Sequence, residues 1–165
     1  MILEKEIGIM PTRLIIMRHA KSSWKDDSLS DHGRPLNSRG KRDAPRIEAE
    51  LIQRDWMPDI VYVSSSKRTQ ETLEIMRKIR LDAEVYSQEE LYHATISTLY
   101  QYVDEVKEHK TTMILSHNPG TEIIVNHLSG RYEVMPTAAV ALFEKQNDEW
   151  NLIDVLRPKK LQNKG

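Results

Sequence analysis

The sequence predicts an α/β domain built as a three-layer sandwich, with a mostly parallel central sheet and helices on both faces. Short apolar runs typical of buried strands alternate with longer segments whose apolar residues recur at helical spacing. The C-terminal part differs, because two strand-like runs follow one another there without a helix between them. These two runs predict a hairpin that adds antiparallel strands at an edge of the sheet.

Six strands are predicted, and each is a short run rich in apolar and β-branched residues. In chain order they lie at residues 14–17, 60–63, 84–86, 111–115, 139–143 and 150–156. The first is typical of a strand buried on both faces, because it reads Leu-Ile-Ile-Met without a polar interruption. The last two are separated by the polar residues 146–148 (Gln-Asn-Asp), which are typical of a hairpin turn.

Four helices are predicted between these strands, at residues 39–54, 67–80, 96–106 and 121–128. Asn37 and Ser38 can cap the first of them, and Thr95 can cap the third. Pro119 lies at the start of the fourth, where proline is tolerated. Pro45 lies inside the first helix, close enough to its first turn to be accommodated.

Composition narrows the possible classes of function. The 165 residues suit one domain over 1–165, with flexible ends expected at 1–11 and 158–165. The absence of cysteine excludes disulfides and thiolate metal sites, and the six histidines show no metal-ligand spacing, so neither a metal nor a cofactor is expected. The net charge of −1 argues against nucleic acid as the main partner.

The sequence also predicts a protein that does not enter a membrane and resides in the cytoplasm. No apolar run approaches the roughly 20 residues that a membrane-spanning helix needs. The first ten residues (MILEKEIGIM) lack the basic segment and the long apolar stretch of a secretory signal.

Polar residues directly follow three of the predicted strands. Arg18 and His19 come after the first strand, Arg68 follows the second within a few residues, and His117 comes after the fourth. Ligands bind beyond the carboxyl ends of parallel strands, so we expect these side chains to converge in one crevice. Arginine binds phosphate with a planar fork, and imidazole can form a covalent phosphoryl intermediate. The set therefore predicts phosphoryl transfer without a metal ion, whose charge the arginines replace.

Three motifs resemble those of the histidine phosphatase superfamily, which includes the cofactor-dependent phosphoglycerate mutases. Residues 18–22 (RHAKS) resemble its R-H-G-x-[ST] signature, and 65–72 (SSKRTQET) resemble its S-x-x-x-R-x-x-x-T motif. Residues 114–120 (ILSHNPG) are similar to the strand and loop that hold the second catalytic histidine. The short chain and residues 34–36 (RPL) are most similar to the SixA group of phosphohistidine phosphatases. The resemblance implies a phosphoglycerate mutase-like α/β sandwich.

The resemblance also implies a role for particular residues. His19 is implied as the nucleophile, Arg18 and Arg68 as ligands of the phosphoryl oxygens, and His117 as a second imidazole of the phosphate pocket. Further substrate contacts are expected at Ser22, Lys25, His93 and Asn118. The chain departs from the family pattern at Ala20, which replaces a glycine, and at Lys25, which stands where the mutases have asparagine.

The carboxylic general acid of many family members has no clear counterpart. One branch places it on the loop before the last βα unit, where this chain offers Glu89 and Glu90, and another uses an aspartate where this chain has Asn118. Phosphohistidine needs such an acid less than a phosphomonoester does, because imidazole leaves more easily than an alkoxide. The sequence therefore favours phosphohistidine in proteins as the substrate. Two alternatives stay open: a small-molecule phosphomonoesterase with Glu89, Glu90 or His93 as the acid, and a phosphate-binding regulatory module without turnover.

Two further groups of residues lie near the expected crevice. The basic cluster of Arg34, Arg39, Lys41, Arg42 and Arg46 is typical of a solvated helix face, which could also steer an acidic phosphoprotein toward the crevice. Trp24 follows the nucleophile segment closely, and it is expected to pack at the core or rim or to line the crevice.

Overall fold

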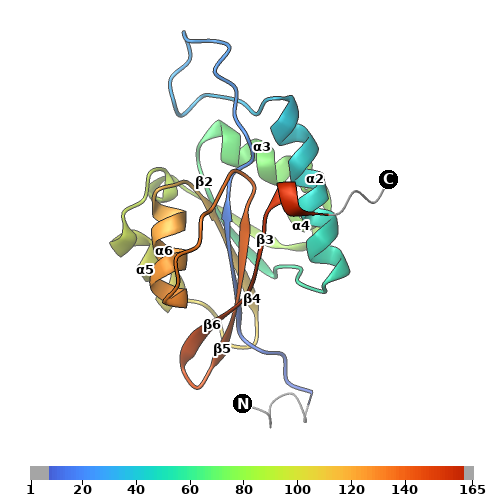
Figure 1. The fold of residues 1–165 in the computed structure, drawn as a ribbon, viewed down its shortest axis with the longest axis vertical. Coiled ribbons are helices and arrows are strands. Elements are labelled where there is room, and N and C mark those ends of the chain that lie inside the picture. The colour runs from blue at the N-terminus through green and yellow to red at the C-terminus, as the bar shows by residue number, and fades with distance from the viewer. Residues whose placement is uncertain (1–7, 162–165) are drawn as a thin grey trace.

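Four parallel strands form the larger part of the sheet in this computed structural model, which describes residues 8–161 (Figure 1). They are β1 (Arg13–Arg18), β2 (Ile60–Ser64), β3 (Glu84–Gln88) and β4 (Thr111–Ser116), in the spatial order β3-β2-β4-β1. The hairpin of β5 (Val140–Gln146) and β6 (Glu149–Leu156) continues the sheet, with β5 antiparallel to β1. The structure thus confirms a mostly parallel sheet with an antiparallel hairpin at one edge.

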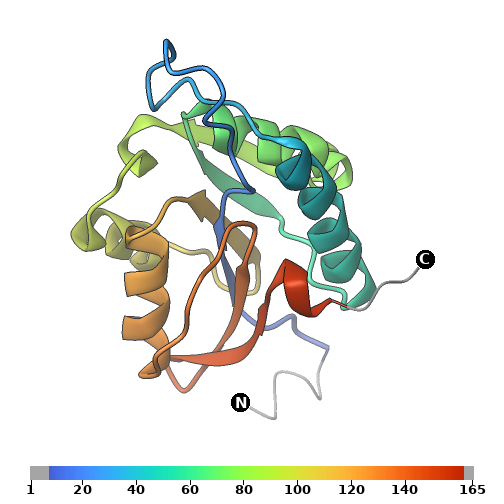
Figure 2. The ribbon, with the colours of Figure 1, turned by 45° about the horizontal axis from the view of Figure 1, so that its top comes forward.

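Helices cover both faces of this sheet, which confirms the three layers (Figure 2). One layer holds α2 (Ser38–Gln53), α3 (Lys67–Ile75) and α4 (Arg77–Asp82), and the other holds α5 (Ile96–Asp104) and α6 (Gly120–Ser129). Alternate residues of β1 point to opposite layers. Ile15 and Met17 belong to the core under α2, α3 and α4, whereas Leu14 and Ile16 belong to the core under α5 and α6.

The first turn of α2 packs against the segment that follows β1. Asn37 caps the helix as predicted, because its side-chain oxygen accepts a hydrogen bond from the Gly40 N–H at 2.9 Å. A Cβ atom at Gly40 would lie 2.3 Å from the Lys21 carbonyl oxygen, so only glycine permits this approach. The Asn37 N–H also donates to that carbonyl, at 3.0 Å. The start of α2 therefore fixes the backbone just beyond the predicted nucleophile.

The prediction of one helix over 67–80 is wrong, because the structure divides this segment into α3 and α4 at Met76. Met76 is fully buried and its ψ of 64° ends the helical backbone. The Ile79 N–H in the first turn of α4 then donates to the Glu48 carboxylate of α2, at 3.0 Å. The carboxylate that stabilises the new helix start is 31 residues away in sequence, so apolar spacing within the segment could not reveal the break.

The C-terminal part described by the structure is more regular than expected. Residues within the predicted flexible end form the short 3-10 helix η2 (Pro158–Lys160), in which Pro158 is buried. Arg46 of α2 holds the following residue by donating to the Leu161 carbonyl oxygen at 3.4 Å. Residues 1–7 and 162–165, which complete the predicted flexible ends, lie outside the described residues. Among the helices described, none is long and apolar enough to cross a membrane.

Candidate active site

His19 lies just beyond the carboxyl end of β1 and is only 6% exposed. Its Nδ1 lies 2.7 Å from the Ala20 carbonyl oxygen, which can only accept a hydrogen bond, so Nδ1 carries the proton. Its Nε2 lies 3.3 Å from Nε of Arg68, which can only donate. The two contacts assign the same tautomer and leave a lone pair on Nε2, which an imidazole needs in order to act as a nucleophile.

Burial lowers the pKa of His19 to about 3. The hydrogen bond to the Ala20 carbonyl opposes this shift, whereas the nearby guanidinium groups of Arg68, Arg18 and Arg34 reinforce it. The imidazole is therefore neutral at neutral pH, without the help of a separate general base.

His117 lies just beyond the carboxyl end of β4, which is the parallel neighbour of β1. Its ring centroid is 5.2 Å from that of His19. Its Nε2 lies 2.8 Å from the hydroxyl oxygen of Ser64, while its buried Nδ1 has no hydrogen-bond partner among residues 8–161. Burial lowers the pKa of His117 to about 2. If Ser64 donates to Nε2, Nδ1 carries the proton and can donate it to a phosphoryl oxygen.

Arg68 is the second residue of α3, whose start is capped by the side chain of Ser66. Its guanidinium is buried and donates to three acceptors: Nε2 of His19, the Asp31 carbonyl oxygen at 2.7 Å and the Asp31 carboxylate at 3.1 Å. Thr72 fixes this helix to the segment after β1, because its hydroxyl accepts from the Ala20 N–H at 3.0 Å and donates to the Arg68 carbonyl oxygen at 2.7 Å.

Arg18 and Asn118 share one backbone acceptor. Nη1 of Arg18 and the side-chain amide of Asn118 both donate to the Met135 carbonyl oxygen, at 3.1 and 2.9 Å. The Asn118 side-chain oxygen accepts from the Thr121 hydroxyl and from the Glu122 N–H at the start of α6. In this structure Asn118 therefore ties the loop after β4 to α6 and to the loop around Met135, while the buried Nε of Arg18 has no partner among the described residues.

The other predicted substrate contacts lie at different depths. Ser22 is buried and forms a backbone bridge with Leu36, whereas Lys25 is exposed on the loop between them. His93 reaches the site: its ring centroid is 5.4 Å from that of His117, and its Nε2 lies 3.3 Å from the Asp31 carboxylate. The structure therefore brings His93 together with the four predicted catalytic residues and leaves Lys25 at the surface above them.

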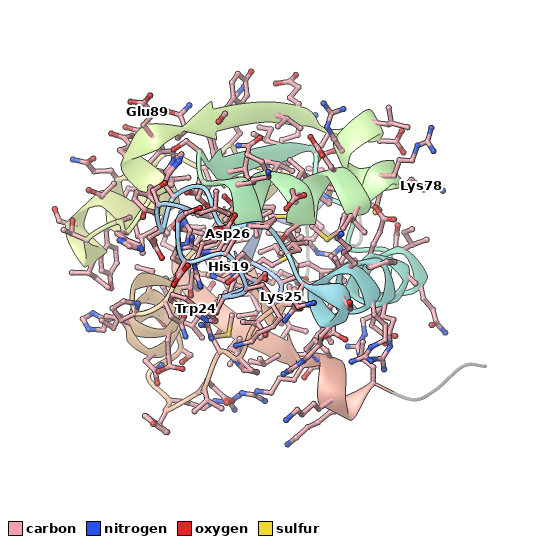
Figure 3. The ribbon with its side chains drawn as sticks, turned by 90° about the horizontal axis from the view of Figure 1, so that it is seen from above. His19, Trp24, Lys25, Asp26, Lys78 and Glu89 are labelled. Atoms are coloured by element: carbon pink, nitrogen blue, oxygen red, sulfur yellow. The ribbon has the colours of Figure 1, made fainter. Side chains whose placement is uncertain are left out.

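Neither of the glutamates considered as general acids contacts His19. Seen from above, Glu89 lies at the outer edge of the molecule, away from His19 (Figure 3). The Glu90 carboxylate accepts a hydrogen bond from the hydroxyl of Tyr102 in α5. The structure thus holds Glu90 by a contact outside the site.

Arg34 is a residue of the site that sequence reasoning missed, and the expected solvated helix face is wrong for it. It lies before α2 and is only 7% exposed. The ring of Trp24 covers its guanidinium, with 3.4 Å between the Arg34 Cζ and the ring centroid. Trp24 itself is 72% exposed and so forms part of the rim of the site. The buried Nη1 of Arg34 has no hydrogen-bond partner within residues 8–161. The sequence did contain a signal for this residue. Arg34 belongs to residues 34–36 (RPL), which resemble the SixA group, whereas the basic residues of the helix do not.

The remaining arginines of the basic cluster do lie on α2, but they are not simply solvated. Arg39, Arg42 and Arg46 surround the buried carboxylate of Asp43, at 3.5, 3.8 and 3.5 Å. Their charges are thus partly engaged within the helix, which weakens the argument that this face steers an acidic partner.

The loop that carries Trp24, Lys25 and Asp31 is closed at its base. Beside the bridge between Ser22 and Leu36, the Ser23 N–H donates to the Pro35 carbonyl oxygen at 2.8 Å. We call residues 23–35 the rim loop.

Comparison with known proteins identifies the family. The model of the histidine phosphatase superfamily (branch 1) matches residues 14–93, which include His19 and Arg68. A SixA structure from Agrobacterium tumefaciens, assigned provisionally as a phosphohistidine phosphatase, superposes with a TM-score of 0.79 at 26% identity, covering 90% of this chain and 99% of that one. The chain belongs to the histidine phosphatase superfamily and is of the SixA type.

Two further proteins are similar to this chain, one in fold and one in sequence. The protein histidine phosphatase SixA complexed with tungstate has the same fold, with a TM-score of 0.78 at 21% identity over 91% of this chain and 99% of that one. An uncharacterized chloroplastic protein of Arabidopsis thaliana is 32% identical over 149 residues, which are 84% of this chain and 68% of the relative.

The two buried histidines of this histidine phosphatase make its stability depend on pH. Both pKa values lie below the 6.5 of an unfolded histidine, so between pH 6.5 and about 3 the unfolded chain binds protons that the folded chain does not. Stability is fully present above pH 6.5 and is lost as the pH falls. We expect each histidine to lower the free energy of unfolding by about 2 kcal/mol between pH 6.5 and 5.

Urea denaturation at pH 7 and pH 5 measures this loss. His117→Gln should remove about half of the contribution of the two histidines. Equal pH dependence in the wild type and in this variant would show that His117 does not resist protonation.

Removal of metal ions is expected to leave phosphatase activity intact. Among residues 8–161 no group of three or more histidine or carboxylate side chains could hold a metal ion. The guanidinium groups of the site can supply the positive charge that phosphoryl transfer requires. The measurement is turnover of an aryl phosphate with and without EDTA. Activity that vanishes with the chelator and returns with added Mg²⁺ or Zn²⁺ would contradict this view.

Proposed function

We propose that this histidine phosphatase hydrolyses phosphohistidine in proteins through a phosphohistidine intermediate on His19, without a metal ion. The observation that carries the proposal is the state of His19: it is buried and neutral, and the lone pair of Nε2 lies beside the Arg68 guanidinium. A neutral imidazole with a free lone pair can attack phosphorus directly.

The reaction proceeds in two displacements at phosphorus. In the first, Nε2 of His19 attacks, a new N–P bond forms, and the P–N bond of the substrate breaks with its electron pair going to the departing imidazole. Arg18, Arg68 and His117 bind the phosphoryl oxygens while charge shifts between them. In the second, water attacks the phosphoryl group on His19 and releases phosphate, and the imidazole returns to its starting state.

The preference for a P–N bond follows from the surroundings of the nucleophile. Glu89 lies away from His19, Glu90 is bonded to Tyr102, and Asn118 cannot supply an acidic proton. Without a carboxylic acid at the leaving group, the rate depends on how readily that group departs. Imidazole and activated phenolates depart readily, whereas a sugar alkoxide does not.

A series of leaving groups tests this preference. We expect kcat/KM to fall steeply as the basicity of the leaving group rises, from phosphohistidine peptide and 4-nitrophenyl phosphate to glycerol and sugar phosphates, at fixed pH and with EDTA present. A flat series, with alkyl phosphates cleaved as fast as phosphohistidine, would contradict the proposal and would require an acid in the site.

A small-molecule phosphomonoesterase is the second candidate, and the position of His93 favours it. This ring lies against His117, where a protonated imidazole could serve as the acid. In that case His93→Gln would reduce the turnover of alkyl phosphates far more than that of 4-nitrophenyl phosphate, whose leaving group needs no proton.

A further inference from the structure

A carboxylate lies among the cations of this phosphate site. Oδ2 of Asp31 is 3.1 Å from Nη2 of Arg68 and 3.3 Å from Nε2 of His93, and it accepts a hydrogen bond from the Tyr92 hydroxyl. Oδ1 of Asp31 is 3.4 Å from Nε of Arg34. The Asp31 side chain is still 41% exposed, so part of the carboxylate can meet a ligand.

A carboxylate is unexpected at this position, because its negative charge repels a phosphoryl group. Asp31 is not a proton donor at neutral pH: the hydrogen bond from Tyr92, followed by the charges of Arg68 and Arg34, lowers its pKa to about 2 although partial burial opposes the shift. A carboxylate that stays ionised can still accept a hydrogen bond from a positively charged part of the substrate.

The geometry connects Asp31 to His19 and to a cluster of aromatic rings. The Arg68 guanidinium contacts the nucleophilic Nε2 of His19 with one nitrogen and the Asp31 carboxylate with another. Next to it, the rings of Tyr92 and His93 stack at 4.1 Å, and both meet the His117 ring edge to face. Aromatic rings of this kind can pack against a planar leaving group.

We propose that Asp31 accepts a hydrogen bond from the second ring nitrogen of the substrate phosphohistidine and thereby selects imidazole as the leaving group. This inference rests on the proposed function. In a phosphohistidine one ring nitrogen is bonded to phosphorus and the other can carry a proton. When it does, the P–N bond breaks with its electron pair going to the ring, and neutral imidazole departs. Asp31 stabilises that protonated ring, so the reacting nitrogen itself needs no acid.

The experiment compares three substrates in the wild type and in Asp31→Asn. The first is a phosphohistidine peptide, the second is phosphoramidate, which has a P–N bond but no second nitrogen, and the third is 4-nitrophenyl phosphate. We expect Asp31→Asn to lower kcat/KM for the peptide by about tenfold or more relative to each of the other two, as the loss of a charged hydrogen bond implies. Asp31→Ser should give the same change in the ratios.

The matched control is Asp26→Asn in the same rim loop. The Asp26 carboxylate accepts from the N–H and the hydroxyl of Ser28, so this variant removes an equal charge from the loop without touching Arg68. Its substrate ratios should equal those of the wild type. An equal fall on all three substrates in Asp31→Asn would overturn the inference, because Asp31 would then only position Arg68.

A rise on all three substrates would also overturn it, because Asp31 would then only compete with the phosphoryl group for the arginines. A failure of the proposed function is visible separately. It appears as a wild-type enzyme that turns over 4-nitrophenyl phosphate but not the phosphohistidine peptide, before any variant is compared.

Discussion

Replacing His19 with alanine is expected to abolish turnover, with kcat falling by about 10⁴-fold or more, while inorganic phosphate still binds. The substitution removes the atom that we propose attacks phosphorus, whereas Arg18, Arg68 and His117 keep their own supports at Met135, Asp31 and Ser64. Steady-state kinetics and calorimetric titration with phosphate measure the two effects. Wild-type enzyme denatured during turnover should carry a phosphoryl group that is labile in acid and stable in base.

A suitable control is His127→Ala, because His127 is an exposed residue of α6 whose ring lies next to Tyr100 outside the site. This variant should retain wild-type kinetics. A phosphoryl group on serine, or the absence of any phosphoenzyme during steady turnover, would exclude His19 as the covalent nucleophile.

Replacing Arg68 with lysine is expected to lower kcat/KM by about tenfold or more, although the positive charge is kept. The planar guanidinium contacts His19 and two oxygens of Asp31 at once. A single ammonium group cannot reproduce these directions together with a bidentate contact to phosphate. Weaker product inhibition by phosphate should accompany the loss.

The matched control is Arg77→Lys at the exposed start of α4, which should change neither the kinetics nor the inhibition by phosphate. Near wild-type kinetics in Arg68→Lys would show that the reaction does not use the planar guanidinium of Arg68.

Much of the fold could be predicted because its signals are local. Apolar runs marked the parallel strands β1, β2 and β4, and Asn37 marked the start of α2. The break at Met76 could not be predicted, because it is stabilised by Glu48 of a different helix. The residues of the site likewise divide into those that the local sequence predicts and those that it does not. His19 and His117 follow parallel strands directly and Arg68 begins the helix after a third, so the topology alone brings them together.

The positions of other residues of the site depend on the path of the rim loop, and no periodicity in the sequence predicts that path. Arg34 reaches the pocket because the loop folds Trp24 over it, and Asp31 reaches Arg68 because the loop crosses the start of α3. Tyr92 was passed over for a similar reason. Its partner Asp31 is 61 residues away in sequence, and nothing in the neighbourhood of either residue indicates the contact.

The closed base of the rim loop separates the proposed catalytic histidines, which follow β1 and β4, from Asp31, which we propose contacts the leaving group. The bridge between Ser22 and Leu36 fixes both ends of residues 23–35, and α2 anchors the neighbouring Lys21 through Gly40. Insertions or exchanges between these ends are tolerated in loops of this kind because the supporting elements do not move. A different rim loop could therefore change which leaving group is accepted without any change in β1, β4 or the histidines that follow them, provided that it still supports Arg68 as Asp31 does.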